Sequence, residues 1–301
     1  MLKTSQPGAK APLLFVRIAS RLGLLSAPKG EVEENKGVEF GPQAILDPVF
    51  LQAYPHHSVL DLSFPLPDQL TPEIYLDTLA HAYTDAIASL SRTLTTDTTL
   101  VCVGGDHSVA LASLASILQI HDPHNVGIVM IDSHGDIHQP STSPSGNFHG
   151  MWLRPVIDHF EHKGIDALVP NKVPPSHLLY IGNLDIEQEE QDFIHKHTIA
   201  TFDKKSLRGG TLTTKIDYLI QHMDHIHISL DIDVFSHIYA PATGMRIAHG
   251  LSPSDIRPIL DQLRRARSYS LDLVEVNPTL TGGTKTVRLA QQMLTTMLND
   301  K

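Results

Sequence analysis

The sequence of 301 residues contains little cysteine, little positive charge and no long apolar run. A single cysteine, Cys102, excludes an internal disulfide framework and is typical of a reducing compartment, so we expect a cytoplasmic protein. Lys and Arg number 23 against 33 Asp and Glu, which argues against a nucleic-acid partner or an anionic membrane surface. No run approaches the ~18 apolar residues of a membrane-spanning helix, so no membrane segment is expected.

Short apolar runs alternate with longer amphipathic ones along the chain, which is typical of an α/β fold with a mainly parallel sheet covered on both faces by helices. We expect one domain over residues 1–301, because α/β domains often reach this length undivided. Residues 1–11 are expected to form a frayed tail. The alternative there is a targeting peptide, because residues 1–30 hold five Lys and Arg and no acid.

The individual elements follow from the same patterns. The predicted strands are 13–18, 59–62, 100–103, 126–131, 178–181, 197–202, 225–232 and 271–276. The predicted helices are 44–53, 72–94, 108–120, 188–197, 211–222, 253–266 and 284–298.

One stretch, V-G-I-V-M-I-D-S-H-G-D-I-H at 126–138, combines a buried strand with a charged end. Residues two apart project to the same side of an extended chain, so Asp132, His134 and Asp136 begin on one face. In a straight strand Asp132 and Asp136 would lie ~13 Å apart, too far to share one ion. The chain must therefore bend near Gly135, or these residues must serve more than one metal ion.

Three further predicted strands also end in ionisable residues. His107 follows 100–103 in G-G-D-H-S, Asp231 and Asp233 end 225–232 in S-L-D-I-D, and Glu275 lies in E-V-N-P. In a parallel sheet, ligands bind beyond the carboxyl ends of the strands. Each motif alone has a simpler explanation, such as a helix cap or a solvated turn, but together they predict a metal site.

The predicted ligands comprise four carboxylates and two imidazoles: His107, Asp132, His134, Asp136, Asp231 and Asp233. One octahedral ion would use all six and leave no position for water or substrate. Two ions that share carboxylates are the more economical interpretation, and this arrangement generates a bridging hydroxide. The absence of thiolates favours hard ions, and Mn²⁺ suits the mixed His and Asp set best.

The order and spacing of these motifs resemble those of the ureohydrolases, the family of arginase, agmatinase and formiminoglutamase. The matching segments are G-V-E-F-G-P at 37–42, G-G-D-H-S at 104–108, D-S-H-G-D at 132–136, S-G-N-F-H-G at 145–150, S-L-D-I-D at 229–233, P-A-T-G at 241–244 and E-V-N-P at 275–278. The resemblance implies a three-layer α/β/α fold, a homo-oligomer (trimer or hexamer) and two Mn²⁺ per chain. It also implies that Asp132 and Asp231 bridge the two ions, with His107 and Asp136 on one and His134 and Asp233 on the other.

By the same resemblance, the reaction is hydrolysis of a small cationic guanidino substrate, L-arginine, to L-ornithine and urea. Glu275 would hold the guanidinium, Asp136 would carry the proton, and His149 would exchange it. The implied substrate-binding residues are His138, Ser145, Asn147 and Glu187.

Three positions depart from the arginase pattern at the far end of the substrate. His138 stands where arginases usually have Asn, Glu187 where they usually have Asp, and Met245 where Thr is common. Hydrolysis of agmatine, a guanidino acid or a formimino compound therefore stays an alternative. A non-catalytic relative would have lost a metal ligand, and a related deacetylase would bind one Zn²⁺; all six ligands are present here.

Overall fold

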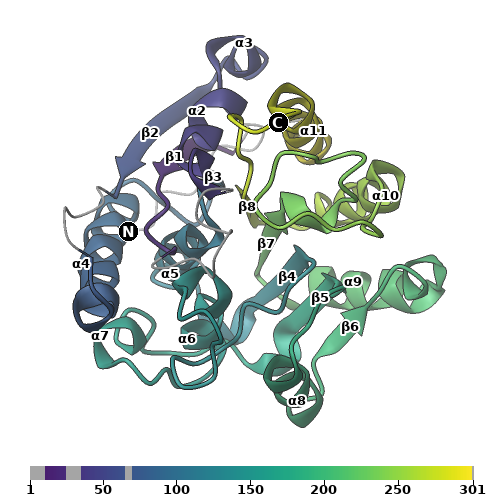
Figure 1. Ribbon diagram of the computed structural model, residues 1–301. Helices are drawn as coiled ribbons and strands as arrows, with labels where there is room; N and C mark the ends of the chain where they lie inside the picture. Colours follow the sequence, from purple (N-terminus) through teal and green to yellow (C-terminus); the bar gives the residue numbers. More distant parts are fainter. Residues whose placement is uncertain (1–10, 25–34, 65–69, 300–301) are drawn as a thin grey trace, which may run out of the picture.

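The computed structural model describes residues 11–24, 35–64 and 70–299. Within these residues, eight strands form one sheet in the order β2-β1-β3-β8-β7-β4-β5-β6, and every adjacent pair is parallel (Figure 1). The strands are β1 (Leu13–Ala19), β2 (His57–Ser63), β3 (Thr99–Gly104), β4 (Val126–Asp132), β5 (Leu178–Gly182), β6 (Ala200–Phe202), β7 (His225–Asp231) and β8 (Tyr269–Val274).

Helices cover both faces of this sheet (Figure 1). On one face lie α4 (Pro72–Ser91), α5 (Ala110–Ile117), α6 (Arg154–Ile157), α7 (Lys163–Asp166) and α8 (Gln188–Lys196). On the other lie α2 (Gly41–Ile45), α3 (Pro48–Leu51), α9 (Gly210–His222), α10 (Pro253–Leu263) and α11 (Gly283–Leu298). The three-layer α/β/α architecture expected from the sequence is confirmed.

The central strands are buried on both faces, and their side chains alternate between two hydrophobic cores. In β4, Ile128 and Met130 belong to the core under α4 and α5, while Val129 and Ile131 belong to the core under α9 to α11. Continuous apolar runs of this kind are what the sequence showed for its predicted strands.

The order of the strands brings the charged strand ends together. Strands β3 and β4 follow each other in the sequence, but β8 and β7 lie between them in the sheet. The four central strands are therefore β3, β8, β7 and β4. A reversal of strand order opens a crevice at the carboxyl edge of a doubly wound sheet. His107, Glu275, Asp231 and Asp132 lie at or just beyond these four strand ends.

Most predicted elements occur with shifted ends, the short helices α6 and α7 were not predicted, and two predicted elements differ more strongly. The predicted helix 44–53 is divided into α2 and α3, because Asp47 caps a new helix whose first residue, Pro48, cannot continue the previous one. The predicted strand 197–202 is shortened to β6. Residues 1–10 of the predicted tail lie outside the described residues. Among the described helices, none has the length and apolar character needed to cross a membrane.

A polar cluster lies inside the core beneath α5. Asp272 of β8 accepts hydrogen bonds from Ser113 Oγ at 2.6 and 2.7 Å, and its Oδ2 lies 3.0 Å from His227 Nε2. Neither the Asp272 nor the His227 side chain is exposed to solvent. The cluster joins α5, β7 and β8, the elements next to His107, Asp231 and Glu275, so it fixes their relative positions through charge and hydrogen bonding.

Replacing Asp272 by Asn removes the charge that faces His227. We expect the free energy of unfolding to fall by about 1–3 kcal/mol, the cost of leaving a buried polar group without its partner. Chemical denaturation followed by circular dichroism measures the change. As a control, Asp261→Asn alters an exposed carboxylate paired with Arg264 and should shift stability by less than about 0.5 kcal/mol. Equal effects of the two substitutions would contradict a role for the buried pair.

Candidate active site

Two groups of side chains have their potential ligand atoms close enough to hold a metal ion. The first is His107, Asp132 and Asp231, and the second is Asp132, His134 and Asp233; within each group the atoms lie within 4.8 Å of one another. Asp132, at the end of β4, belongs to both groups. A carboxylate shared between two groups is suited to bridging two cations.

Asp136 joins the first group through a sharp bend of the chain. Its Oδ2 lies 2.9 Å from His107 Nδ1, as close as the carboxylate of Asp132 at 3.0 Å. The backbone of Asp136 has a positive φ of 53°, in the left-handed region that side chains other than glycine seldom adopt. The chain therefore bends after β4, and the potential ligand atoms fall into two groups, so this geometry is compatible with both of the arrangements that the sequence allowed.

The nitrogen at the centre of the first group has the surroundings of a metal ligand. His107 Nδ1 lies within 3.1 Å of carboxylate oxygens of Asp132, Asp136 and Asp231, yet it forms no hydrogen bond of regular geometry among the described residues. Its other ring nitrogen lies 2.8 Å from Ser229 Oγ, which orients the imidazole. An atom held this way among buried oxygens fits a bound cation, and an oxygen-rich set of donors suits a hard one.

The electrostatics of the carboxylates lead to the same conclusion. Burial and the negative charges of Asp233 and Asp132 raise the pKa of Asp231 well above its ordinary value. Burial is also the main cause that raises the pKa of Asp233 to about 6, although His134 opposes it. Carboxyl groups crowded in a buried site resist ionisation, and divalent cations reverse this preference.

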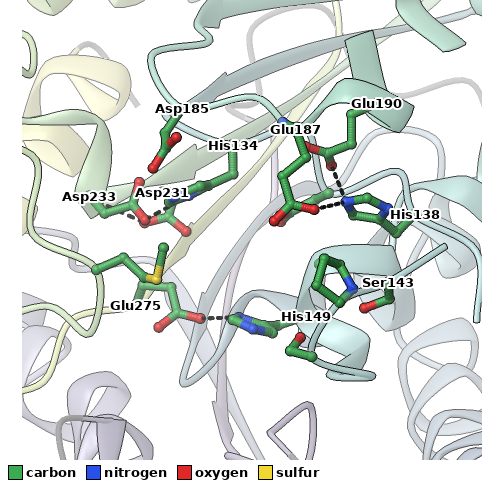
Figure 2. A pocket seen from close by; sticks show the side chains of 15 residues that line it. His134, His138, Ser143, His149, Asp185, Glu187, Glu190, Asp231, Asp233 and Glu275 are labelled. Carbon is green, nitrogen blue, oxygen red and sulfur yellow. Dashed lines mark hydrogen bonds and ion pairs between the residues drawn. The ribbon is translucent and has the colours of Figure 1, made fainter. Parts of the chain in front are cut away.

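A cavity of about 240 Å³ opens above these ligands. Asp136, Asp231 and Asp233 line it together with Glu275 and His149. Figure 2 shows His149 facing Glu275, with Nδ1 3.7 Å from Oε1. Burial tends to lower the pKa of His149, but the nearby carboxylate of Glu275 and its negative charge outweigh burial and raise the pKa above its usual value.

Glu275 is held in place by the segment that carries His107. Its Oε1 accepts a hydrogen bond from the His107 N–H at 2.8 Å, and its own N–H donates to Gly105 O at 2.8 Å. The residue follows β8 with a positive φ of 65°. These contacts fix a buried carboxylate at the cavity wall.

At the opposite wall, two predicted substrate-binding residues contact each other. His138 Nε2 lies 2.7 Å from Glu187 Oε2, and Figure 2 shows the ring facing both Glu187 and Glu190. Ser145 and Met245 also line the cavity. Asn147 is not among the described residues that line it; it is buried, and its N–H donates to Ser145 Oγ at 3.2 Å.

Sequence reasoning missed two acids of this wall, Asp185 and Glu190. Glu190 accepts hydrogen bonds from the Ile137 and Glu187 N–H groups, and burial, followed by the charge of Asp136, raises its pKa to about 7. The available signal was the acidic pair three residues apart, Glu187 and Glu190, which forms a capping box at the start of α8. That pattern predicts a helix start, not a residue at a site.

Comparison with known proteins agrees with this geometry. The sequence matches the family described as Arginase family over residues 20–299. The chain belongs to the arginase family. It is 34% identical over 205 residues to the arginase of Staphylococcus aureus (strain COL), covering 66% of this chain and 67% of that protein. The arginase of Brevibacillus brevis is 28% identical over 295 residues, covering 93% and 98%.

Among solved structures, the native arginase of Bacillus caldovelox is similar with a TM-score of 0.82 at 26% identity, covering 97% of this chain and 99% of that one. The family resemblance of the sequence motifs is thereby confirmed. Membership makes this arginase-family protein a hydrolase of C–N bonds.

Because Asp132 belongs to both ligand groups, its removal should have a larger effect than removal of a ligand from one group. We expect two divalent ions per chain in the Mn²⁺-loaded protein, one in Asp233→Ala, and none retained in Asp132→Ala. Elemental analysis after gel filtration counts them. Asp185→Ala, which removes a cavity carboxylate outside both groups, should keep two. A single ion in the unaltered protein would refute the two-ion arrangement.

Proposed function

We propose that the protein is a binuclear manganese hydrolase that cleaves L-arginine to L-ornithine and urea. The observation that carries this proposal is the pair of His and Asp groups that share Asp132 at the floor of an acid-lined cavity. Asp185, Glu187 and Glu275 add negative charge to the walls. A cavity of this size and sign suits a small cation such as a guanidinium compound.

The two metal ions would lower the pKa of a water molecule and so supply a nucleophile at neutral pH. Glu275 would accept hydrogen bonds from the guanidinium through Oε2, since Oε1 already accepts the His107 N–H. This charge-assisted contact would orient the guanidinium carbon for attack.

Asp136 and His149 would carry the protons of the reaction. Asp136 would accept the proton released by water and deliver it to the nitrogen of the departing amine, because it lies at the cavity floor beside the ligands. His149 is partly exposed and faces Glu275, which suits exchange of a proton between the site and solvent.

The far end of L-arginine carries both an ammonium and a carboxylate, and the wall opposite Glu275 offers a partner for each. Glu187 is about half exposed and would accept a hydrogen bond from the ammonium, whereas His138 would donate one to the carboxylate. Before substrate binds, the two side chains contact each other, with His138 Nε2 2.7 Å from Glu187 Oε2. Binding of L-arginine would separate Glu187 from His138. Glu187 would then contact the ammonium of the substrate, and His138 its carboxylate.

The alternative guanidino substrates differ from L-arginine only at this end. Agmatine keeps the ammonium and lacks the carboxylate, and 4-guanidinobutanoate keeps the carboxylate and lacks the ammonium. Release of urea from all three, measured after Mn²⁺ loading, therefore tests the proposal. The highest kcat/KM with L-arginine supports it, a preference for agmatine would assign the protein as an agmatinase, and no urea from any of them would refute a guanidino substrate.

Glu187→Ala tests the assignment of the ammonium partner. We expect KM for L-arginine and for agmatine to rise about 10-fold or more, since a hydrogen bond to a charged group contributes ~1.5–3 kcal/mol. The kcat should change less, because the contact is remote from the reacting carbon.

The matched controls are a substrate and a neighbouring residue. KM for 4-guanidinobutanoate should not rise in Glu187→Ala, because this compound has no ammonium. Glu189→Ala removes an exposed acid of the same helix turn that lies outside the cavity, and it should leave all three substrates unaffected. An equal rise with every substrate would show that Glu187 does not bind the ammonium.

A further inference from the structure

The segment 150–154, G-M-W-L-R, which we call the brace, lies along the turn that carries Asp136. Leu153 N–H donates to Asp136 O at 3.1 Å, and His138 N–H donates to Gly150 O at 3.2 Å. Arg154 Nε donates to Ile137 O at 2.9 Å. Three consecutive residues of the turn, 136–138, are therefore hydrogen-bonded to the brace.

The turn needs such support because its backbone is strained. Asp136 adopts a left-handed conformation with φ at 53°, which is unfavourable for a residue with a side chain. Surrounding structure has to compensate this cost for the conformation to persist. The hydrogen bonds of the brace provide that compensation on both sides of Asp136.

Trp152 is the residue of the brace that reaches the ligands themselves. Its Nε1–H donates to Asp136 Oδ2 at 3.0 Å, the oxygen that lies 2.9 Å from His107 Nδ1. Its ring packs against the imidazole of His107, with centroids 5.0 Å apart at 37°. Trp152 is fully buried, so one rigid side chain contacts two ligands of the first metal group.

We propose that Trp152 is a positioning residue for the metal ion of the His107 group. This inference rests on the proposed function. An indole N–H can only donate, so it fixes the carboxylate of Asp136 with Oδ2 toward His107. The ring limits rotation of the imidazole at the same time. Hydrogen bonds to metal ligands from outside the coordination sphere raise metal affinity by orienting the ligands before the ion binds.

Trp152 can report on metal binding, because it is the only tryptophan in the sequence. Fluorescence excited at wavelengths where tyrosine does not absorb comes from this indole alone. Mn²⁺ is paramagnetic and quenches nearby fluorophores, so we expect saturable quenching as the metal-free protein takes up its first ion. Binding of Mn²⁺, detected as loss of the free-ion signal in electron paramagnetic resonance, without any change in fluorescence would overturn the proposal.

Trp152→Phe keeps an aromatic ring and removes the donor. We expect its affinity for one of two Mn²⁺ ions to fall 10- to 100-fold, the usual effect of losing such a contact, while the other ion binds as before. At saturating Mn²⁺, kcat should fall while KM for the substrate stays unchanged. Free Mn²⁺ measured by electron paramagnetic resonance gives the affinities independently of activity.

Tyr269→Phe is the matched control, because it also removes a donor from a buried aromatic residue. The Tyr269 hydroxyl donates to Met297 O at 2.9 Å in the other hydrophobic core, so this variant should bind two Mn²⁺ normally. Equal affinities in Trp152→Phe and the unaltered protein would overturn the inference alone. Failure of the unaltered protein to bind two ions would instead overturn the proposed function. Should Trp152→Phe not fold, the absence of quenching in the fluorescence titration would still overturn the inference.

Discussion

The arrangement of the candidate active site depends on several carboxylates that lie close together at one buried edge of the sheet. Asp136, Asp231 and Asp233 lie at the floor of the cavity, with the buried Asp132 next to them and Glu275 and Glu190 on the cavity walls. Burial is the main cause that raises the pKa of Asp231 and of Asp233, and the negative charge of Asp132 adds to it. Such a cluster opposes folding unless positive charge compensates it. His107 and His134 lie among these acids and lower the pKa of Asp132, and the divalent ions proposed for this site would supply further positive charge.

Residues with unfavourable backbone conformations also lie at this edge of the sheet. Asp136 and Glu275 are two of the four described residues other than glycine that have positive φ, and both contact the segment that carries His107. Strained residues gather where a side chain must point in a direction that regular structure does not allow. Here Asp136 and Glu275 follow the ends of β4 and β8, and their side chains line the cavity. The hydrogen bond from Glu275 N–H to Gly105 O and the hydrogen bonds of the brace stabilise these backbone conformations.

The sequence predicted those parts of the site that depend on local pattern. Strand ends were visible as apolar runs that stop at Asp132 or Asp231, and parallel topology brings such ends together. Trp152, Glu190 and Asp185 could not be predicted in this way, because their positions at the site depend on contacts between segments that are distant in the sequence. Trp152 meets Asp136 across 16 positions, and Glu190 meets Ile137 across 53. Whether such residues meet depends on how loops fold over the sheet, which periodicity does not encode.

Strand β7 illustrates how one periodic pattern serves both stability and function. His225, His227, Ser229 and Asp231 project to one face, because alternate residues of a strand share a side. His227 contacts Asp272 in the core, Ser229 orients His107, and Asp231 is a predicted metal ligand. Polar side chains therefore follow one another along this face from the core to the cavity. A shift of β7 by one residue would place all four polar side chains among the apolar residues of the opposite core, so the pattern that builds the site also fixes the register of the strand.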